Sequence, residues 1–127
     1  MRKVSIDATA IGRKEPIEVA VETGRVRQSI AVMKTIAGVQ VKQKNASKAS
    51  EAEQDAYVMD FLASIDDMLS AIIKYIGDCF GLNKKQREAL ETYDPEALQE
   101  LAQNIAAAVM GFGDTAPTED DQKSTTD

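Results

Sequence analysis

The spacing of apolar residues separates a strand-like N-terminal region from the helix-like remainder of the chain. Apolar residues alternate with polar ones in KVSIDATAIG and again in EPIEVAVE. A period of two is typical of β-strands, and Gly12 between the two segments suits a turn. Residues 1–22 are therefore predicted to form a short β-hairpin or strand pair. Two strands alone are marginally stable, so this pair needs a helix to cover it.

The next segment, GRVRQSIAVMKTIAG, follows the helical period instead. Its apolar residues recur at spacings of three and four, which predicts a helix over residues 24–37, with Thr23 as its cap and Gly38 as its stop. The following VQVKQKNASKAS has no sustained period and is rich in Lys, Gln, Ser and Asn. Residues 39–49 are therefore predicted to form an exposed linker.

The strongest periodicity lies in the middle of the chain. Apolar residues recur at spacings of three and four from Tyr57 to Phe80, over about seven turns. This pattern predicts a long central helix over residues 50–80, and Gly81 supplies its end. Cys79 falls on the apolar face of this helix, where burial is the expected role of a lone cysteine.

Cap signals define two further helices. Asn83, with Gln86 three residues later, forms a capping box for a short helix over residues 84–92. The Asp-Pro pair that follows supplies the cap and the first-turn proline of a last helix over residues 95–110, and a glycine ends it.

Together these patterns predict a mainly α protein. We expect a small helical bundle with a long central helix, a short N-terminal strand pair and a disordered acidic C-terminal tail. The 127 residues leave room for one domain, which we place at residues 1–111. Residues 112–127 hold five acids against one lysine and a single large apolar residue, so we expect them to form the tail.

The charges are unevenly distributed along the chain. Residues 1–48 hold ten Lys or Arg and four Asp or Glu, whereas residues 49–127 hold five and seventeen. The simpler interpretation is that the basic and acidic halves pair within one fold. The alternative is that complementary patches serve a polar protein partner or self-association of the chain.

The residue types present exclude most catalytic chemistry. Histidine is absent, which removes the commonest general base and the commonest metal ligand, and one cysteine cannot build a zinc site. The glycines of GFGDTAP follow a helix and lack the lysine of a phosphate-binding loop. We therefore predict no enzymatic activity, no catalytic residues, no cofactor and no metal.

A helix-turn-helix rhythm in DCFGLNKKQREALETYDPEAL raises the alternative of a small transcriptional regulator. A recognition helix needs cations for phosphate, but the last helix carries Glu96 and Glu100 and no Lys or Arg. The chain also has no eighteen-residue apolar run and no signal peptide. We therefore expect neither nucleic acid nor membrane as a partner, and we expect a cytosolic protein.

Two segments resemble a known family, the tail assembly chaperones of long-tailed bacteriophages. IIKYIGDCFGLNKKQREALETYDPEALQELAQNIAAAVMG resembles the family's apolar helix ending in Phe-Gly, its short polar helix, its acidic cap and its last helix. VAVETGRVRQSIAVMKTI is similar to the family's earlier strand and basic-starting helix. The segment VQVKQKNASKASEAEQ and the acidic tail match no part of this pattern.

The resemblance implies a function in virion assembly. A member of this family would be a late protein of the bacterial host cytoplasm that binds the tape measure protein and keeps it soluble. It would also help recruit tail tube protein subunits and be absent from the mature virion. Many members are also made in a longer form by programmed ribosomal frameshifting. A structural adaptor retained in an assembled particle remains an alternative.

Protein binding is thus the expected activity, by apolar helix faces that accept a partner's apolar segment. Most aliphatic side chains should fill this protein's own core. The candidates for a partner-binding surface lie on the first helix and at the start of the central one: Val26, Ile30, Met33, Tyr57 and Phe61.

Overall fold

The structure is a computed structural model that describes residues 2–111. The predicted acidic tail, 112–127, lies outside the described residues. The elements are β1 (Lys3–Ile6), the 3-10 turn η1 (Thr9–Ile11), β2 (Ile17–Ala20), α1 (Thr23–Lys48), α2 (Glu51–Phe80), α3 (Lys84–Leu90) and α4 (Pro95–Met110). This confirms a mainly α fold with a short N-terminal strand pair.

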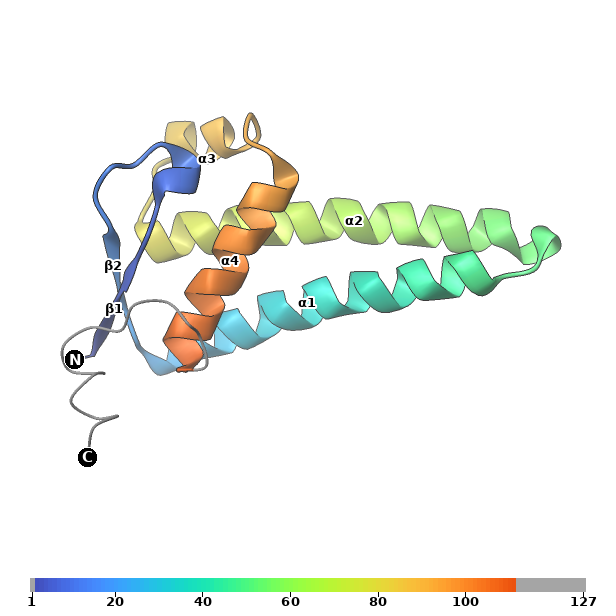
Figure 1. Cartoon of the computed structure of the whole chain (residues 1–127), viewed down its shortest axis with the longest axis horizontal. Coiled ribbons are helices and arrows are strands. Elements are labelled where there is room, and N and C mark those ends of the chain that lie inside the picture. The colour runs from blue at the N-terminus through green and yellow to red at the C-terminus, as the bar shows by residue number, and fades with distance from the viewer. Residues whose placement is uncertain (1, 112–127) are drawn as a thin grey trace.

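A long hairpin of two antiparallel helices dominates the molecule (Figure 1). α1 and α2 lie side by side, joined by a tight connection that we call the distal end of the hairpin. The strands, α3 and α4 gather at the opposite, proximal end, where α4 crosses the hairpin obliquely. The body of the protein therefore surrounds only one end of the hairpin.

The strand pair is antiparallel and packs on the helices. Val4 pairs with Val19 and Ile6 with Ile17, so alternate apolar residues of both strands share one face. Val4, Ile6 and Val19 are buried in the same core as the helices. The helices thus supply the cover that a two-stranded sheet requires.

The core lies where α4 meets the hairpin. Ile72 and Ile76 of α2 and Ile105 of α4 have no exposed surface, and neither do Ala102 and Ala106. The small alanines let α4 approach the hairpin closely, while the branched residues fill the space between the helices.

The prediction that the first helix stops at Gly38 is wrong. α1 continues to Lys48, so the predicted exposed linker over 39–49 is helical as well. A glycine inside a helix costs about 1 kcal/mol, and packing on α2 outweighs this cost because Val39 and Ala46 are buried. The polar composition of the segment had hidden this sparse buried stripe.

Two predicted details of the helix ends are also wrong. Glu22, rather than Thr23, is the N-cap residue of α1, and no side chain caps that helix. The short helix ends at Leu90 rather than at residue 92, because the next residues form a turn.

The other end signals are confirmed. Gly81 ends α2 and Gly111 ends α4, with φ of 64° and 83°, in the left-handed region that suits glycine. Asn83 and Gln86 form the predicted capping box, and the side chain of Asp94 accepts from the amide of Glu96. These signals act within one turn of chain and do not depend on distant packing.

Candidate protein-binding surface

The distal half of the hairpin extends beyond the rest of the fold. α2 has 30 residues and α4 has 16, which correspond to lengths of about 45 and 24 Å. Because α4 crosses obliquely near the proximal end, it leaves the distal part of α2 uncovered (Figure 1). Every residue from 51 to 60 is exposed.

An apolar stripe runs along this uncovered part of α2. Val58, Leu62 and Ile65 follow one another at spacings of four and three, so they lie on one face of the helix. We call these three residues the distal stripe. Val58 is 37% exposed and Leu62 is 53% exposed, while Ile65 is half-buried. Exposed apolar side chains that adjoin one another are typical of interaction surfaces.

The distal stripe is the continuation of the core-facing side of α2. The same spacing leads from Ile65 through Leu69 to Ile72 and Ile76, which are completely buried. The apolar pattern of α2 thus extends beyond the part of α2 that α4 covers.

Other large apolar residues are exposed near the same end of the hairpin. Met59 is 67% exposed, Val41 57% and Tyr57 39%. The candidates chosen from the sequence include Tyr57 but not Leu62, Val58 or Met59. The signal for these residues is a difference in length: the apolar pattern of α2 is longer than α4, the helix that covers it.

The five predicted surface residues form no single patch. Ile30 is 41% exposed, and Tyr57 is exposed as well. The other three are half-buried and pack against the core: Val26, Met33 and Phe61.

The register of the hairpin separates the two predicted groups. Ser29 contacts Tyr75, and Lys42 contacts Ser64. In this register Met33 lies level with about residue 71 of α2, roughly 15 Å along the helix axis from Phe61. The predicted residues of α1 and of α2 therefore occupy different parts of the hairpin.

The two arms of the distal hairpin differ in charge. Residues 51–73 of α2 hold six acids and no Lys or Arg, whereas the distal half of α1 carries Lys42, Lys44 and Lys48. Lys42 joins the arms, because its Nζ lies 2.8 Å from Ser64 Oγ and 3.3 Å from Asp60 Oδ1. This ion pair shows some pairing between the basic and acidic halves of the chain within the fold.

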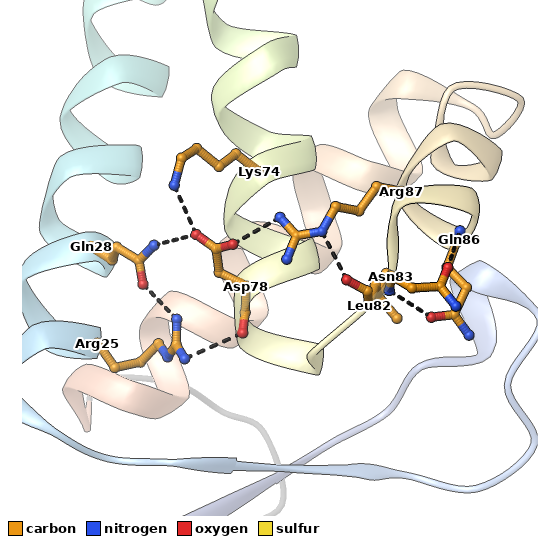
Figure 2. Close-up of polar contacts among 8 residues, drawn as sticks. All are labelled: Arg25, Gln28, Lys74, Asp78, Leu82, Asn83, Gln86 and Arg87. Carbon is orange, nitrogen blue, oxygen red and sulfur yellow. Dashed lines mark hydrogen bonds and ion pairs between the residues drawn. The ribbon is translucent and has the colours of Figure 1, made fainter.

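At the proximal end a polar network holds the hairpin to α3 (Figure 2). The carboxylate of Asp78 accepts from Gln28 Nε2 at 2.7 Å, from Lys74 Nζ at 2.9 Å and from Arg87 Nη1 at 2.8 Å. Partial burial acts to raise the pKa of Asp78, but the hydrogen bonds from Lys74, Arg87 and Gln28 outweigh it and lower the pKa to about 2. The network fixes the base from which the hairpin extends.

Gly77 makes room for this network. A Cβ at this position would lie 2.9 Å from Arg87 Cζ, so the guanidinium lies directly on the glycine. Arg87 Nε also donates to the carbonyl of Leu82 at 2.9 Å. Gly77 therefore admits the side chain of Arg87 against the backbone of α2.

A buried polar pair joins α1 and α2 beside the network. Ser29 donates to the carbonyl of Arg25 at 2.8 Å, and its hydroxyl also bonds to that of Tyr75. Burial raises the pKa of Tyr75, and it raises the pKa of Cys79 to about 11. Cys79 is therefore a protonated, buried thiol at neutral pH, as its position on the apolar face predicted.

The described part of the chain contains no group of three or more side chains suited to holding a metal ion. None of the helices described between residues 2 and 111 combines the length and apolar character needed to cross a membrane.

The helix-turn-helix rhythm has a structural explanation, because α4 packs against α1, α2 and β1. The buried residues of α4 include Leu98, Leu101 and Val109.

The fold and this surface define a helical protein whose body presents a projecting hairpin with exposed apolar residues. The profile of a family described as phage tail assembly chaperone proteins matches residues 3–125. The chain therefore belongs to this family. Searches of curated proteins and of solved structures gave no match.

Membership gives the protein a general role. It acts as a chaperone in the assembly of a phage tail, in contact with phage tail proteins. A chaperone role points away from catalysis and toward binding. The exposed distal end of the hairpin is the candidate surface for such binding.

Proposed function

We propose that this protein is a non-enzymatic chaperone that binds the tape measure protein and helps recruit tail tube subunits while the tail is assembled. The observation that carries the proposal is the row of exposed apolar residues on the distal hairpin, in a chain that belongs to the tail assembly chaperones. Exposing apolar side chains to water is unfavourable in free energy, so their presence on the surface favours a binding role.

The chemistry of the surface suits a long helical client. Helices with exposed apolar stripes aggregate before they are assembled, unless another apolar surface covers the stripes. The distal stripe has the spacing that an amphipathic helix can meet, and its side chains lie on an arm of two paired helices. The flexible side chain of Met59 adds a surface that adapts to different apolar neighbours.

The small size of the surface supports reversible binding. Three apolar side chains bury much less than the ~1,200 Å² of a stable protein interface. A long client with repeated apolar segments would therefore be covered by several copies, each bound weakly. Weak binding also allows the chaperone to leave the client once tail tube subunits are recruited. We propose that this takes place in the host cytoplasm and that the mature virion lacks the protein.

The proposal is tested by the solubility of the client. The tape measure protein of the same phage is expressed in bacteria alone, with this chain, or with an unrelated soluble helical protein at equal abundance. We expect several times more soluble tape measure protein with this chain than with either control. Equal solubility in all three would refute the proposed function.

A second measurement separates a chaperone from an adaptor. Purified mature virions are analysed by quantitative mass spectrometry, with the tube protein as the reference. We expect only trace amounts of this chain. A fixed stoichiometric ratio to a tail protein would instead show an adaptor retained in the particle.

A further inference from the structure

We infer that the distal stripe binds one amphipathic α-helix whose apolar residues follow the i, i+4, i+7 spacing and whose flank beside α2 carries Lys or Arg. This inference rests on the proposed function, since it names the kind of client segment that the same surface binds. The expected complex is a three-helix bundle made of α1, α2 and the client helix.

The first argument is continuity with an interface that the fold already contains. α4 packs on the proximal part of α2, where Ile72 and Ile76 are fully buried. The distal stripe continues this apolar side of α2 with the same spacing. A surface that accepts one amphipathic helix at its proximal end is built to accept another further along.

The second argument is space. Leu62 lies ten residues from Ile72, which is roughly 15 Å along the axis of α2. The client helix of a three-helix bundle runs along α2, and residues 51–65 offer it fifteen residues, roughly 22 Å of helix. In the described part of the structure no element covers the distal half of the hairpin (Figure 1). A client helix therefore fits beside α4 without displacing it.

The third argument is charge. Asp55 precedes Val58 by three residues and Asp66 follows Leu62 by four, so both acids adjoin the distal stripe. Among residues 2–111 neither Asp55 nor Asp66 takes part in an ion pair. A client helix with Lys or Arg on the adjoining flank would complement them.

The same acids argue against two other occupants. In a symmetric pair of copies joined by their distal stripes, Asp55 and Asp66 of one copy would approach those of the other. Residues 112–127 of this chain carry five acids against one lysine and would meet the same repulsion. A basic-flanked helix of another protein satisfies both the apolar and the charged features.

The inference is tested with two synthetic peptides and the full chain. Both are fluorescein-labelled helical 15-residue peptides with leucines at i, i+4, i+7 and i+11; one has lysine flanks and the other glutamate flanks. Binding is followed by fluorescence anisotropy at low and high salt. We expect the lysine peptide to bind at least about tenfold more tightly than the glutamate peptide, with a smaller difference at high salt.

Matched variants locate the binding. Leu62→Gln should weaken binding of the lysine peptide at least about tenfold, whereas Val41→Gln, equally exposed but on α1, should leave it unchanged. Asp66→Asn should reduce the preference for lysine flanks. All three positions are exposed, and circular dichroism checks that each variant keeps its helical content.

Three results would overturn the inference. They are equal binding by Leu62→Gln and the unchanged chain, equal binding of the two peptides, and no peptide binding combined with a dimer that Leu62→Gln dissociates. The solubility assay separates this failure from that of the function. If the unchanged chain and Leu62→Gln both keep the tape measure protein soluble, the inference fails and the proposed function stands. If neither chain keeps the tape measure protein soluble, the proposed function is refuted. The peptide titrations then decide separately whether the distal stripe binds a basic-flanked helix.

Discussion

At the residue scale, Asp78 is the point where three helices are joined. Its carboxylate receives hydrogen bonds from Gln28 of α1, Lys74 of α2 and Arg87 of α3. Sequence alone shows the Lys74 and Asp78 pair, which lie one turn apart, but it cannot show that Gln28 and Arg87 arrive from other elements. The capping box of α3 and the side-chain cap of α4 were predictable for the opposite reason, because their partners lie within three residues.

The low pKa of Asp78 makes stability depend on pH. Its folded value of about 2 lies below the ordinary value of 3.8, so the charged form stabilises the fold above pH 4. This stabilisation is lost as the pH falls from about 4 to 2. It amounts to at most about 2 kcal/mol, because the carboxylate is partly solvated.

The measurement is urea denaturation of the unchanged chain and of Asp78→Asn between pH 7 and pH 2. We expect the unchanged chain to be more stable at pH 7 and the difference to shrink below pH 4. A difference that stays constant down to pH 2 would show that the network does not hold the charged carboxylate.

Gly77 and Arg87 should be coupled energetically. In the unchanged chain, Gly77→Ala gains about 1 kcal/mol of helix propensity but pushes the guanidinium of Arg87 from Asp78 and Leu82. In an Arg87→Ala background the same substitution should simply stabilise the fold.

A double-mutant cycle measured by chemical denaturation checks this coupling. We expect a coupling energy of about 1–2 kcal/mol between positions 77 and 87. Additive effects of the two substitutions would contradict the close contact between Arg87 and Gly77.

At the element scale, the length of α1 is the clearest difference between sequence and structure. Gly38 and the polar residues after it are typical of a helix end, so the local pattern predicted that the first helix ends at Gly38. Whether a polar segment stays helical depends on a neighbour that the local pattern does not show. Here α2 is that neighbour, since it runs beside α1 along the hairpin (Figure 1), and Val39 and Ala46 of α1 are buried. The long, periodic α2 was predictable because its signal extends over many turns.

Gly38→Ala should stabilise the protein. Gly38 lies inside α1, and nothing lies within 4 Å of a Cβ placed there. Alanine therefore gains about 0.5–1 kcal/mol through helix propensity and raises the melting temperature by a few degrees.

Gly81→Ala is the matched control for thermal unfolding. Its φ of 64° strains any residue with a Cβ, although the space around it is equally open. We expect a loss of about 1 kcal/mol there. Destabilisation by Gly38→Ala would contradict a continuous α1.

At the scale of the whole molecule, the protein has a compact body and a projecting arm. The described buried core cluster includes no residue between Val39 and Met68, so the body does not depend on the distal arm for its core. This division was not visible in the sequence, because it depends on where α4 crosses the hairpin. The sequence alone could not single out the distal stripe for the same reason: an apolar stripe is exposed only beyond the end of the helix that covers it.

Shortening the arm should separate stability from binding. Removing residues 40–46 and 58–64 takes one heptad from each arm and keeps the observed register between α1 and α2. We expect a cooperative thermal transition, with about 1–2 kcal/mol less stability from the lost helix pairing. The shortened chain should lose the ability to keep the tape measure protein soluble. Retained activity would place the client elsewhere on the molecule.

The central claim is that the distal stripe contacts the client, and photo-crosslinking tests it most directly. Benzoylphenylalanine is placed at position 62 or at position 41, each in a chain co-expressed with the tape measure protein. Irradiation of intact cells should crosslink the tape measure protein through position 62 and scarcely through position 41, which lies on α1 and is equally exposed. Equal crosslinking from both positions, or crosslinking from position 41 alone, would contradict the account.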